Sequence, residues 1–535
     1  MTSDPTRVTI AGGGLAGLTA ALRLAERGYR VKLYEQKPAL GGDLGSRPGP
    51  DGVALDVYPH MYLSWYHNFW RLLGDATGEE REERFRPFTS VKQLRRGDFP
   101  KFTAVSDATS ARRMFQDVLS GAASPADMFV FTYGSVDLLA ERLNPTMSLD
   151  DVSVNGFLNS RPYMTERAAA ICDSFVTRVW AIRSYLASAD DYRDFLAYTL
   201  AEPTATYWLA SGPAQRQVIE PLRAALEAAG VEIDTSVRVT TVSCSDRRVS
   251  EIALERNGES WTEEVDQLVL AVPEDALLSL VRSGEPGHRI VEAAPRLAEV
   301  SRLSSISIPI VQLYFNRKLP RVPPEPVGLF DSGLALAFTD ISQSWEGVAP
   351  FAGRTVLSLS ASDPYGLPGT GPHENAHAML LELAEYLDFD PGARWGESSD
   401  IDWERTRFEA NTDSQLFVNE TGTDIWRPGA SCEGVSNLSF AGDFCANRIG
   451  MTTIESAVTT GLEAARVIVD RCGRGAPIEI TEPSSGNGAF YVWLRYAWAP
   501  YAFAAKAWST GSDCVGWMRH LLTPTRPPGR QRRDS

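Results

Sequence analysis

The sequence predicts an α/β fold made of two interleaved domains, and three observations lead to this prediction. A strand–helix–strand unit opens the chain at residues 8–11, 18–26 and 31–34. A strand at 437–441 and a long helix at 453–471 return to the same domain near the other end. The chain has 535 residues, and a single core stops growing at roughly 250–300 residues, so a second domain is expected between these segments.

Helical spacing dominates the first half of the intervening chain, and strand patterns follow it. Helices are expected at 111–119, 148–158, 165–182, 190–200, 218–229 and 373–387. Strands are expected at 231–233, 237–244, 248–256, 267–271, 305–315, 355–359 and near 406. Residues 36–75 are rich in Gly, Pro and Tyr and are expected to form irregular loop.

Composition narrows the class of protein. The chain is 43% hydrophobic and 22% charged, as is typical of a globular protein. Its net charge of −16 argues against nucleic acid as a partner, because phosphate contacts need a basic face. The cysteines form no C-x-x-C pair, which fits a reducing cytoplasm. No signal-peptide pattern and no run of about 18 apolar residues occurs, so a cytoplasmic protein without a membrane span is expected.

A glycine-rich turn separates the first strand from the first helix. Its sequence GGGLAG matches G-x-G-x-x-G at Gly12, Gly14 and Gly17. The first glycine permits a tight turn, the second lets the backbone approach a pyrophosphate, and the third lets helix and strand pack closely. Leu15 and Ala16 begin the helix, whose N-terminal amides face a phosphate. This setting predicts a Rossmann-type dinucleotide-binding domain.

Three further segments indicate which dinucleotide binds. Glu35, followed by Gln36, ends the second strand 18 residues after Gly17, where a carboxylate can accept the ribose hydroxyls. A second glycine turn, Gly41-Gly42, follows closely. Far along the chain, the strand at 437–441 runs into Gly442-Asp443 and a long helix. Such an acidic residue can hold ribityl hydroxyls, and the helix N-terminus can face the pyrimidine edge of a flavin. The features favour FAD.

These motifs resemble a known superfamily. Five parts of the chain resemble the FAD-dependent amine oxidases and phytoene desaturases. They are the glycine motif, LGG at 40–42, GVEIDTSVRVTTV at 230–242, LVLAVP at 268–273, and NLSFAGDF at 437–444 with MTTIESAVTTGLEAARVI at 451–468. The segments at 56–74, 207–230 and 308–320 are most similar to the carotenoid desaturase branch. The resemblance runs from residue 7 to about 472.

The resemblance implies a set of cofactor-binding residues beyond the glycine motif and Glu35. The Val239 backbone would meet the adenine, and Gly442 and Asp443 would take the pyrophosphate and ribityl chain. The isoalloxazine would lie against Pro59, His60, Met61, Met451, Thr452 and Thr453, with Ala271 and Pro273 in the nearby AVP turn. We expect an FAD domain from 1–105, 210–275 and 400–472, a substrate domain of mixed sheet and helices from 106–209 and 276–399, and a C-terminal extension at 473–535.

The implied activity is hydride transfer between FAD N5 and a hydrophobic polyene or isoprenoid substrate, as in phytoene desaturation. The alternative is an NADPH-using redox cyclase of polyene natural products of the polycyclic tetramate macrolactam type. Only one dinucleotide fingerprint is present, so NADPH would bind transiently without a Rossmann unit of its own. No lysine follows the AVP turn, which argues against amine oxidation, and Asp43 stands where the family usually has a basic residue.

The sequence allows more than one role for several other residues. His60 and Arg448 are candidate catalytic residues near the flavin, and either could instead be structural. His373-Glu374-x-x-His377 matches a zinc peptidase motif, but a solvated helix face is the simpler interpretation and no metal site is expected. A non-catalytic flavin-binding partner protein is a further alternative. The aromatic stretch at 490–503 predicts a docked helix pair, an interfacial element with peripheral membrane contact, or a substrate-channel element.

Overall fold

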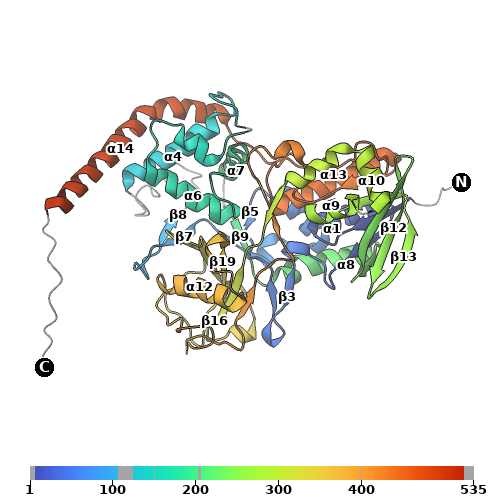
Figure 1. Ribbon diagram of the computed structural model, residues 1–535, viewed down its shortest axis with the longest axis horizontal. Coiled ribbons are helices and arrows are strands. Elements are labelled where there is room, and N and C mark those ends of the chain that lie inside the picture. The colour runs from blue at the N-terminus through green and yellow to red at the C-terminus, as the bar shows by residue number, and fades with distance from the viewer. Residues whose placement is uncertain are drawn as a thin grey trace.

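The computed structural model describes residues 6–105, 124–149, 151–202, 207–282, 284–398 and 400–522. The side chains of 104–105, 284–288 and 512–522 are outside this description. The helix expected at 111–119 lies outside the described residues. Figure 1 shows an elongated molecule with α1 and α13 at one end and α4, α6 and α14 at the other, and with α12 and β16 below α6 in this view.

A five-stranded parallel sheet forms the domain that contains the glycine motif. Its strands are β1 (Arg7–Ala11), β2 (Arg30–Glu35), β10 (Glu232–Thr235), β14 (Gln267–Leu270) and β22 (Leu438–Phe440), in the order β10-β2-β1-β14-β22. Strands β1, β14 and β22 are apolar and buried, as both faces of a parallel sheet require. The predicted opening strand–helix–strand unit is confirmed.

Two helices pack together against this sheet. They are α1 (Leu15–Ala25) and α13 (Ile454–Cys472). A Cβ on Gly461 would lie 2.4 Å from the Ala16 carbonyl oxygen, so only glycine allows this close approach. Helix α8 (Glu220–Ala228) contacts α1 and precedes β10.

An antiparallel meander extends from the parallel sheet. It consists of β11 (Arg238–Ser245), β12 (Arg248–Arg256) and β13 (Glu259–Glu264). Strand β13 was not expected, because its residues ESWTEE are mostly polar and lack a strand-like apolar pattern. The strand is held by its ladder to β12 and is largely exposed at the edge of the meander.

A seven-stranded mixed sheet forms the second domain, as expected. The strands are β20 (Arg407–Glu409), β16 (Ile310–Tyr314), β19 (Val356–Ala361), β18 (Leu336–Asp340), β17 (Val327–Leu329), β7 (Val91–Leu94) and β8 (Thr103–Val105), in that order. Helix α12 (Pro372–Ala384) buries Met379, Leu380 and Leu383 in the core with Val311 and Leu357. The helix therefore covers one face of the sheet, as Figure 1 shows.

The strand expected at 305–315 is two strands. Strand β15 (Ser304–Ile306) pairs with β21 (Leu416–Val418), whereas β16 pairs with β19 and β20. Pro309 separates the two segments and lacks the amide that a continuous ladder would need.

Strand pairing also differs from the expected domain boundaries. Strands β7 and β8 and strand β20 were assigned to the FAD domain, but they complete the seven-stranded sheet. Helices α9 (Glu274–Arg282) and α10 (Gly284–Ala293) lie in the segment assigned to the substrate domain. Leu277 and Ile290 from these helices share a core with Ile252 of the meander. The two domains exchange more segments than the sequence indicated.

The segment at 36–75 contains more regular structure than expected. A hairpin of β3 (Ser46–Pro48) and β4 (Ala54–Asp56) precedes β5 (Tyr62–Leu63) and helix α2 (His67–Thr77). Strand β5 joins a small sheet with β9 (Tyr207–Ala210) and β6 (Phe85–Phe88). The rings of Tyr62, Trp70 and Phe85 pack together in this region, so the aromatic residues act as core.

A helical group lies at the far end of the molecule. It contains α4 (Pro125–Ala140), α5 (Val154–Asn159), α6 (Glu166–Trp180), α7 (Ala189–Ala201) and α14 (Gly488–Leu522). The short helix α11 (Ile341–Ser344) is not part of this group and follows β18 of the seven-stranded sheet. Side-chain oxygens of Ser124, Ser153, Thr165 and Ser188 cap the first four of these helices. The expected C-terminal helix pair is wrong, because α14 continues through Pro500 as one helix. Within the described residues, no helix is both long enough and apolar enough to cross a membrane.

Candidate active site

The glycine motif forms a cradle at the carboxyl end of β1. Gly12 has φ +109°, and a Cβ there would lie 2.0 Å from the Ala271 carbonyl oxygen. A Cβ on Gly17 would lie 2.0 Å from the Gly12 oxygen. By contrast, a Cβ on Gly14 would meet only the Gly42 Cα, at 4.0 Å. Packing requires the first and third glycines, while the second leaves open space over the backbone, as pyrophosphate binding requires.

Glu35 joins the cradle to the end of β2. Its Oε2 accepts a 2.7 Å hydrogen bond from the Gly13 amide, and its Oε1 accepts one of 2.7 Å from the Lys37 amide. The Gly41 amide donates to the Gly13 carbonyl over 2.8 Å. The structure thus brings Glu35 and both glycine turns together. Gln36 is exposed beside them, and Val239 lies half-buried on β11, near the Val237 amide that donates to the Glu35 carbonyl.

The second predicted segment lies at the same edge of the sheet. Strands β1, β14 and β22 are parallel neighbours, so their carboxyl ends bring Gly12, Ala271–Pro273 and Gly442 to one edge. Gly442 has φ +150° and donates its amide to Thr460 Oγ1 over 3.1 Å. Asp443 follows it and is partly buried.

Arg427 fixes the loop that follows β22. Its guanidinium donates to the carbonyl oxygens of Asp443, Phe444 and Cys445, each over 3.0 Å, and to that of Gly450. The side chain is only 6% exposed. Sequence reasoning missed this residue, since a single arginine before a proline carries no signal of burial.

Three of the residues expected against the isoalloxazine, Met451, Thr452 and Thr453, lie immediately before helix α13. Thr453 caps the helix by accepting a 3.0 Å hydrogen bond from the Ser456 amide. The Thr452 amide donates to Asn419 Oδ1 over 2.7 Å, and Met451 is fully buried. Thr452 Oγ1 is buried and has no hydrogen-bond partner among the described residues. A ligand at this helix terminus would supply one.

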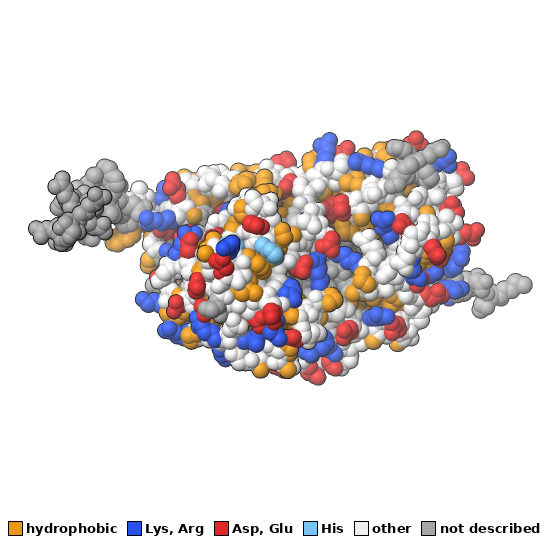
Figure 2. Space-filling view, turned by 60° about the horizontal axis from the view of Figure 1, so that its bottom comes forward, with side chains coloured by type: hydrophobic (Ala, Val, Ile, Leu, Met, Phe, Trp, Pro, Cys, Tyr) orange, Lys and Arg blue, Asp and Glu red, His pale blue; other side chains and the backbone are white. Residues whose placement is uncertain are grey.

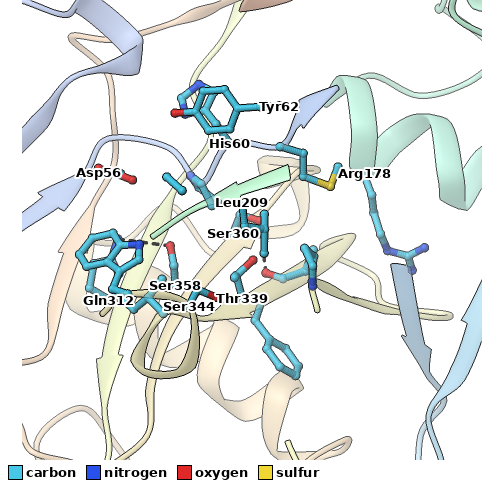
Figure 3. Close-up of a pocket in the computed structure, with 18 residues that line it drawn as sticks. Asp56, His60, Tyr62, Arg178, Leu209, Gln312, Thr339, Ser344, Ser358 and Ser360 are labelled. Atoms are coloured by element: carbon cyan, nitrogen blue, oxygen red, sulfur yellow. Dashed lines mark hydrogen bonds between the residues drawn. The ribbon is translucent and has the colours of Figure 1, made fainter. Parts of the chain in front are cut away.

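A cavity of about 120 Å³ lies between the two domains. Pro59, His60 and Met61 line one side of it, with Asp56 and Tyr62. Figure 3 shows Asp56, His60 and Tyr62 on one side. Opposite them lie Thr339 and Ser358 of the seven-stranded sheet and Ser344 of the short helix α11. The residues expected beside the flavin therefore also face a partly open space between the domains.

Asp56 is the cavity carboxyl that the sequence did not reveal. Its Oδ1 accepts hydrogen bonds from Ser46 Oγ over 2.7 Å and from the Ala214 amide over 2.8 Å. Oδ2 has no hydrogen-bond partner in the described part of the chain. Burial raises the pKa of Asp56 to about 7, so the group exchanges a proton near neutral pH.

His60 has a different character from the one expected. Burial lowers the pKa of its imidazole to about 4, so the ring is neutral at physiological pH. Its Nδ1 has no partner among the described residues. A neutral imidazole is a poor proton donor, and the structure favours Asp56 over His60 for acid–base chemistry at this cavity.

Comparison with known proteins assigns this architecture to a family. The sequence model described as "Flavin containing amine oxidoreductase" matches residues 15–469. The chain belongs to this family. It is therefore an FAD-dependent oxidoreductase, and the glycine cradle, the open space over Gly14 and the buried Thr452 hydroxyl fit an FAD molecule.

Several relatives of this flavin-containing amine oxidoreductase act on carotenoids by name. Carotenoid phi-ring synthase of Streptomyces griseus is 26% identical over 519 residues, which span 91% of this chain and 92% of that protein. The 15-cis-phytoene desaturase of Synechococcus elongatus is 22% identical over 478 residues, spanning 87% and 96%. The predicted resemblance to the amine oxidase and phytoene desaturase superfamily is confirmed.

Solved structures show the same fold. An oxidoreductase from Methanosarcina mazei aligns with a TM-score of 0.59 at 15% identity, covering 87% of this chain and 100% of that one. Cyclohexylamine oxidase from Brevibacterium oxydans aligns with a TM-score of 0.56 at 15% identity, covering 88% and 100%. The predicted α/β fold of a flavin oxidoreductase is confirmed.

Three carboxyl groups of the flavoenzyme lie close enough to influence one another at the cradle. Burial raises the pKa of Asp43 to about 7, and the negative charge of Asp443 raises it further. Burial likewise raises the pKa of Glu274 to about 7, with contributions from Asp443 and Asp43. Burial also raises the pKa of Asp443 to about 6, against the opposing charge of Arg427. The cradle thus holds acidic groups where the bound cofactor is itself anionic.

The remaining candidates lie away from this site. Arg448 is 69% exposed and pairs with Glu482 at the surface, so the structure does not bring it to the cavity. His373 stacks on Trp395, with ring centroids 5.3 Å apart, and His377 Nε2 contacts the Gly392 carbonyl at 3.2 Å. The described residues contain no group of three His, Cys, Asp or Glu side chains placed to hold a metal.

Proposed function

We propose that this flavoenzyme oxidises one end of a hydrophobic, carotenoid-like polyene. The observation that carries the proposal is the partly open cavity that lies between the Pro59–Met61 loop and the seven-stranded sheet. The names of the relatives, phi-ring synthase and phytoene desaturase, support a carotenoid-like substrate. The absence of a lysine after the AVP turn also favours hydrocarbon over amine chemistry.

The size of the cavity indicates how such a substrate would bind. A cavity of about 150 Å³ holds one benzene ring, and this cavity measures about 120 Å³. It therefore fits a few carbons or most of one ring, which is a small part of a long polyene. Only the reacting end of the polyene would enter the cavity, and the remaining chain would lie outside it.

The side chains around the cavity would orient the substrate, exclude water and supply one proton acceptor. FAD, when bound, supplies the two-electron oxidant by accepting a hydride. Apolar side chains such as Leu209 and Phe338, which line the cavity, orient the carbon–hydrogen bond and exclude water. The substrate also loses a proton, and Asp56 Oδ2 would accept it as the carbon–carbon double bond forms. His60, held neutral by burial, would remain a polar wall of the cavity.

The test is anaerobic mixing of the FAD-loaded protein with phytoene, ζ-carotene and β-carotene in detergent micelles. The proposal predicts that one of these polyenes reduces the flavin and bleaches its visible absorbance. It is overturned if no polyene does so while NADPH bleaches the flavin, an outcome that would favour the redox cyclase. A stable flavin that neither polyene nor NADPH reduces would favour a non-catalytic flavin-binding protein.

A further inference from the structure

Helix α14 is fixed to the body of the protein along one side. Arg495 forms an ion pair with Asp137 (Nε to Oδ1, 2.6 Å) and another with Glu141. Ala502 is fully buried, and Ser509 Oγ contacts Asp127 Oδ1 at 2.8 Å. These three positions are seven residues apart, so they lie on one face of the helix. That face is occupied by α4, next to which α14 runs in Figure 1.

The opposite face of α14 is aromatic and exposed. Its large side chains are Phe490, Trp493, Tyr496, Tyr501, Phe503 and Trp508, whose exposed fractions range from 48% to 77%. Half of the large hydrophobic side chains that are exposed in the described part of the chain therefore lie on this one helix. Leu143, which is 61% exposed, lies against Gly488 and continues the surface. We call this surface the aromatic face.

The aromatic face carries no charge over residues 489–511. The charged residues in this stretch are Arg495 and Lys506. Arg495 is buried, and the Lys506 ammonium donates to the Pro162 carbonyl over 2.8 Å. Elsewhere the surface has charges of both signs, which are spread over the side shown in Figure 2. An exposed apolar surface of this kind, bounded by polar residues, is typical of an interaction site.

We propose that the aromatic face docks on the surface of an anionic lipid bilayer. Trp and Tyr prefer the boundary between apolar and aqueous surroundings, and six aromatic residues on one side of a helix provide a row of such groups. The helix would lie in the plane of the membrane interface. This orientation is consistent with the finding that no helix of the described residues is long and apolar enough to cross a membrane.

Charge favours a bilayer over a protein partner as the occupant. The chain as a whole has a net charge of −16, which anionic lipids would repel. Residues 519–535, whose first four residues are the end of α14, nevertheless contain five arginines and one aspartate. A basic segment next to an amphipathic helix is attracted to anionic headgroups. The local excess of arginine is thus placed where a bilayer contact would use it.

The test is flotation of the full-length, FAD-loaded protein with phosphatidylcholine vesicles that contain or lack phosphatidylglycerol. We compare the wild type with the triple variant Trp493→Ser, Tyr501→Ser and Trp508→Ser. The matched control is Tyr365→Ser with Ile425→Ser, since these residues are 86% and 68% exposed but lie elsewhere. The visible flavin spectrum and melting temperature establish that each variant is folded.

We expect the wild type and the control to float with the anionic vesicles and the triple variant to bind at least about tenfold more weakly, because binding scales with buried apolar area. Equal flotation of the triple variant overturns the proposal, as does a wild type that stays in solution. Light scattering without lipid tests the competing occupant. If the wild type forms a dimer and the triple variant does not, the aromatic face binds a second copy of the chain, and the proposed bilayer contact is overturned.

Discussion

The Ala214 amide donates a 2.8 Å hydrogen bond to Asp56 Oδ1, although 158 residues separate the two in the chain. Ser46 Oγ donates to the same oxygen. Both bonds stabilise the carboxylate and orient it, and they leave the other oxygen on the cavity side. The two hydrogen bonds therefore hold the Asp56 carboxyl group in one orientation.

Replacing Asp56 with Asn should slow the oxidation by about 10²–10⁴-fold, the usual contribution of a general base. Because the carboxylate form accepts the proton, wild-type activity should rise with pH through about 7, the pKa of Asp56. The variant should lose this rise and keep its FAD. Stopped-flow flavin reduction across pH measures both effects.

The control for Asp56 is Asp340→Asn. Asp340 is also buried, but its oxygens accept hydrogen bonds from Ser342 and Gln343 in its own turn. A pH profile unchanged in Asp56→Asn, or lost equally in Asp340→Asn, would refute the role of Asp56 as the proton acceptor.

Substitution by alanine should affect stability at Gly17 and FAD binding at Gly14. Gly17→Ala places a Cβ 2.0 Å from the Gly12 carbonyl oxygen, so the variant should be strongly destabilised, with a melting temperature several degrees lower or no folded protein. Gly14 has φ −73° and open space around it. Gly14→Ala should therefore keep the apoprotein stability and weaken FAD binding. Thermal unfolding with and without added FAD separates the two, and equal behaviour would contradict the cradle described above.

Arg427→Gln should weaken FAD retention and lower stability by about 3–5 kcal/mol, the cost of disrupting a buried charged network. The loop at 443–450 would lose the donor that holds its carbonyl oxygens. Arg223→Gln provides the control, because Arg223 is exposed and pairs only with Glu227 one helical turn away. Denaturant unfolding and flavin release measure the difference, and similar values for both variants would contradict a specific role for Arg427.

FAD affinity should fall as pH rises from about 6 to 8. Burial and mutual repulsion raise the pKa of Asp43 to about 7, and an anionic pyrophosphate would raise it again. Binding therefore takes up protons, and affinity is higher where the carboxyls are already protonated. Titration of the apoprotein with FAD at several pH values measures this slope.

Asp43→Asn should flatten that slope and tighten FAD binding at pH 8. Asp43→Arg should tighten it more, since a basic residue supplies a phosphate contact that the wild type lacks. The protonation argument fails if the slope of Asp43→Asn equals that of the wild type.

The parts of the fold that were predictable are those with local signals. The glycine turn, Glu35 and the start of α13 each lie next to a strand or helix that its own residues specify, and parallel strands must end at one edge. Asp56 could not be found in this way, because its environment includes Ala214, which is far away in the chain. Arg427 was missed because its partners are backbone carbonyl oxygens of a following loop, which no residue pattern marks. The continuity of α14 through Pro500 depends on its contacts with α4, which override the local preference of proline.

The strand order β10-β2-β1-β14-β22 has a consequence for synthesis in the cell. Neighbouring strands in this sheet are drawn from residues 7 to 440, so the glycine turn emerges from the ribosome long before the strand that completes its edge. At about 5–20 residues per second, this delay is roughly 20–90 s. During that time the nascent chain has neither a finished cofactor site nor the stabilisation that cofactor binding brings. Once β14 has been made, its outer edge also lacks its permanent neighbour until β22 emerges. Newly made protein should therefore depend on chaperones, and on the supply of FAD, at the end of translation.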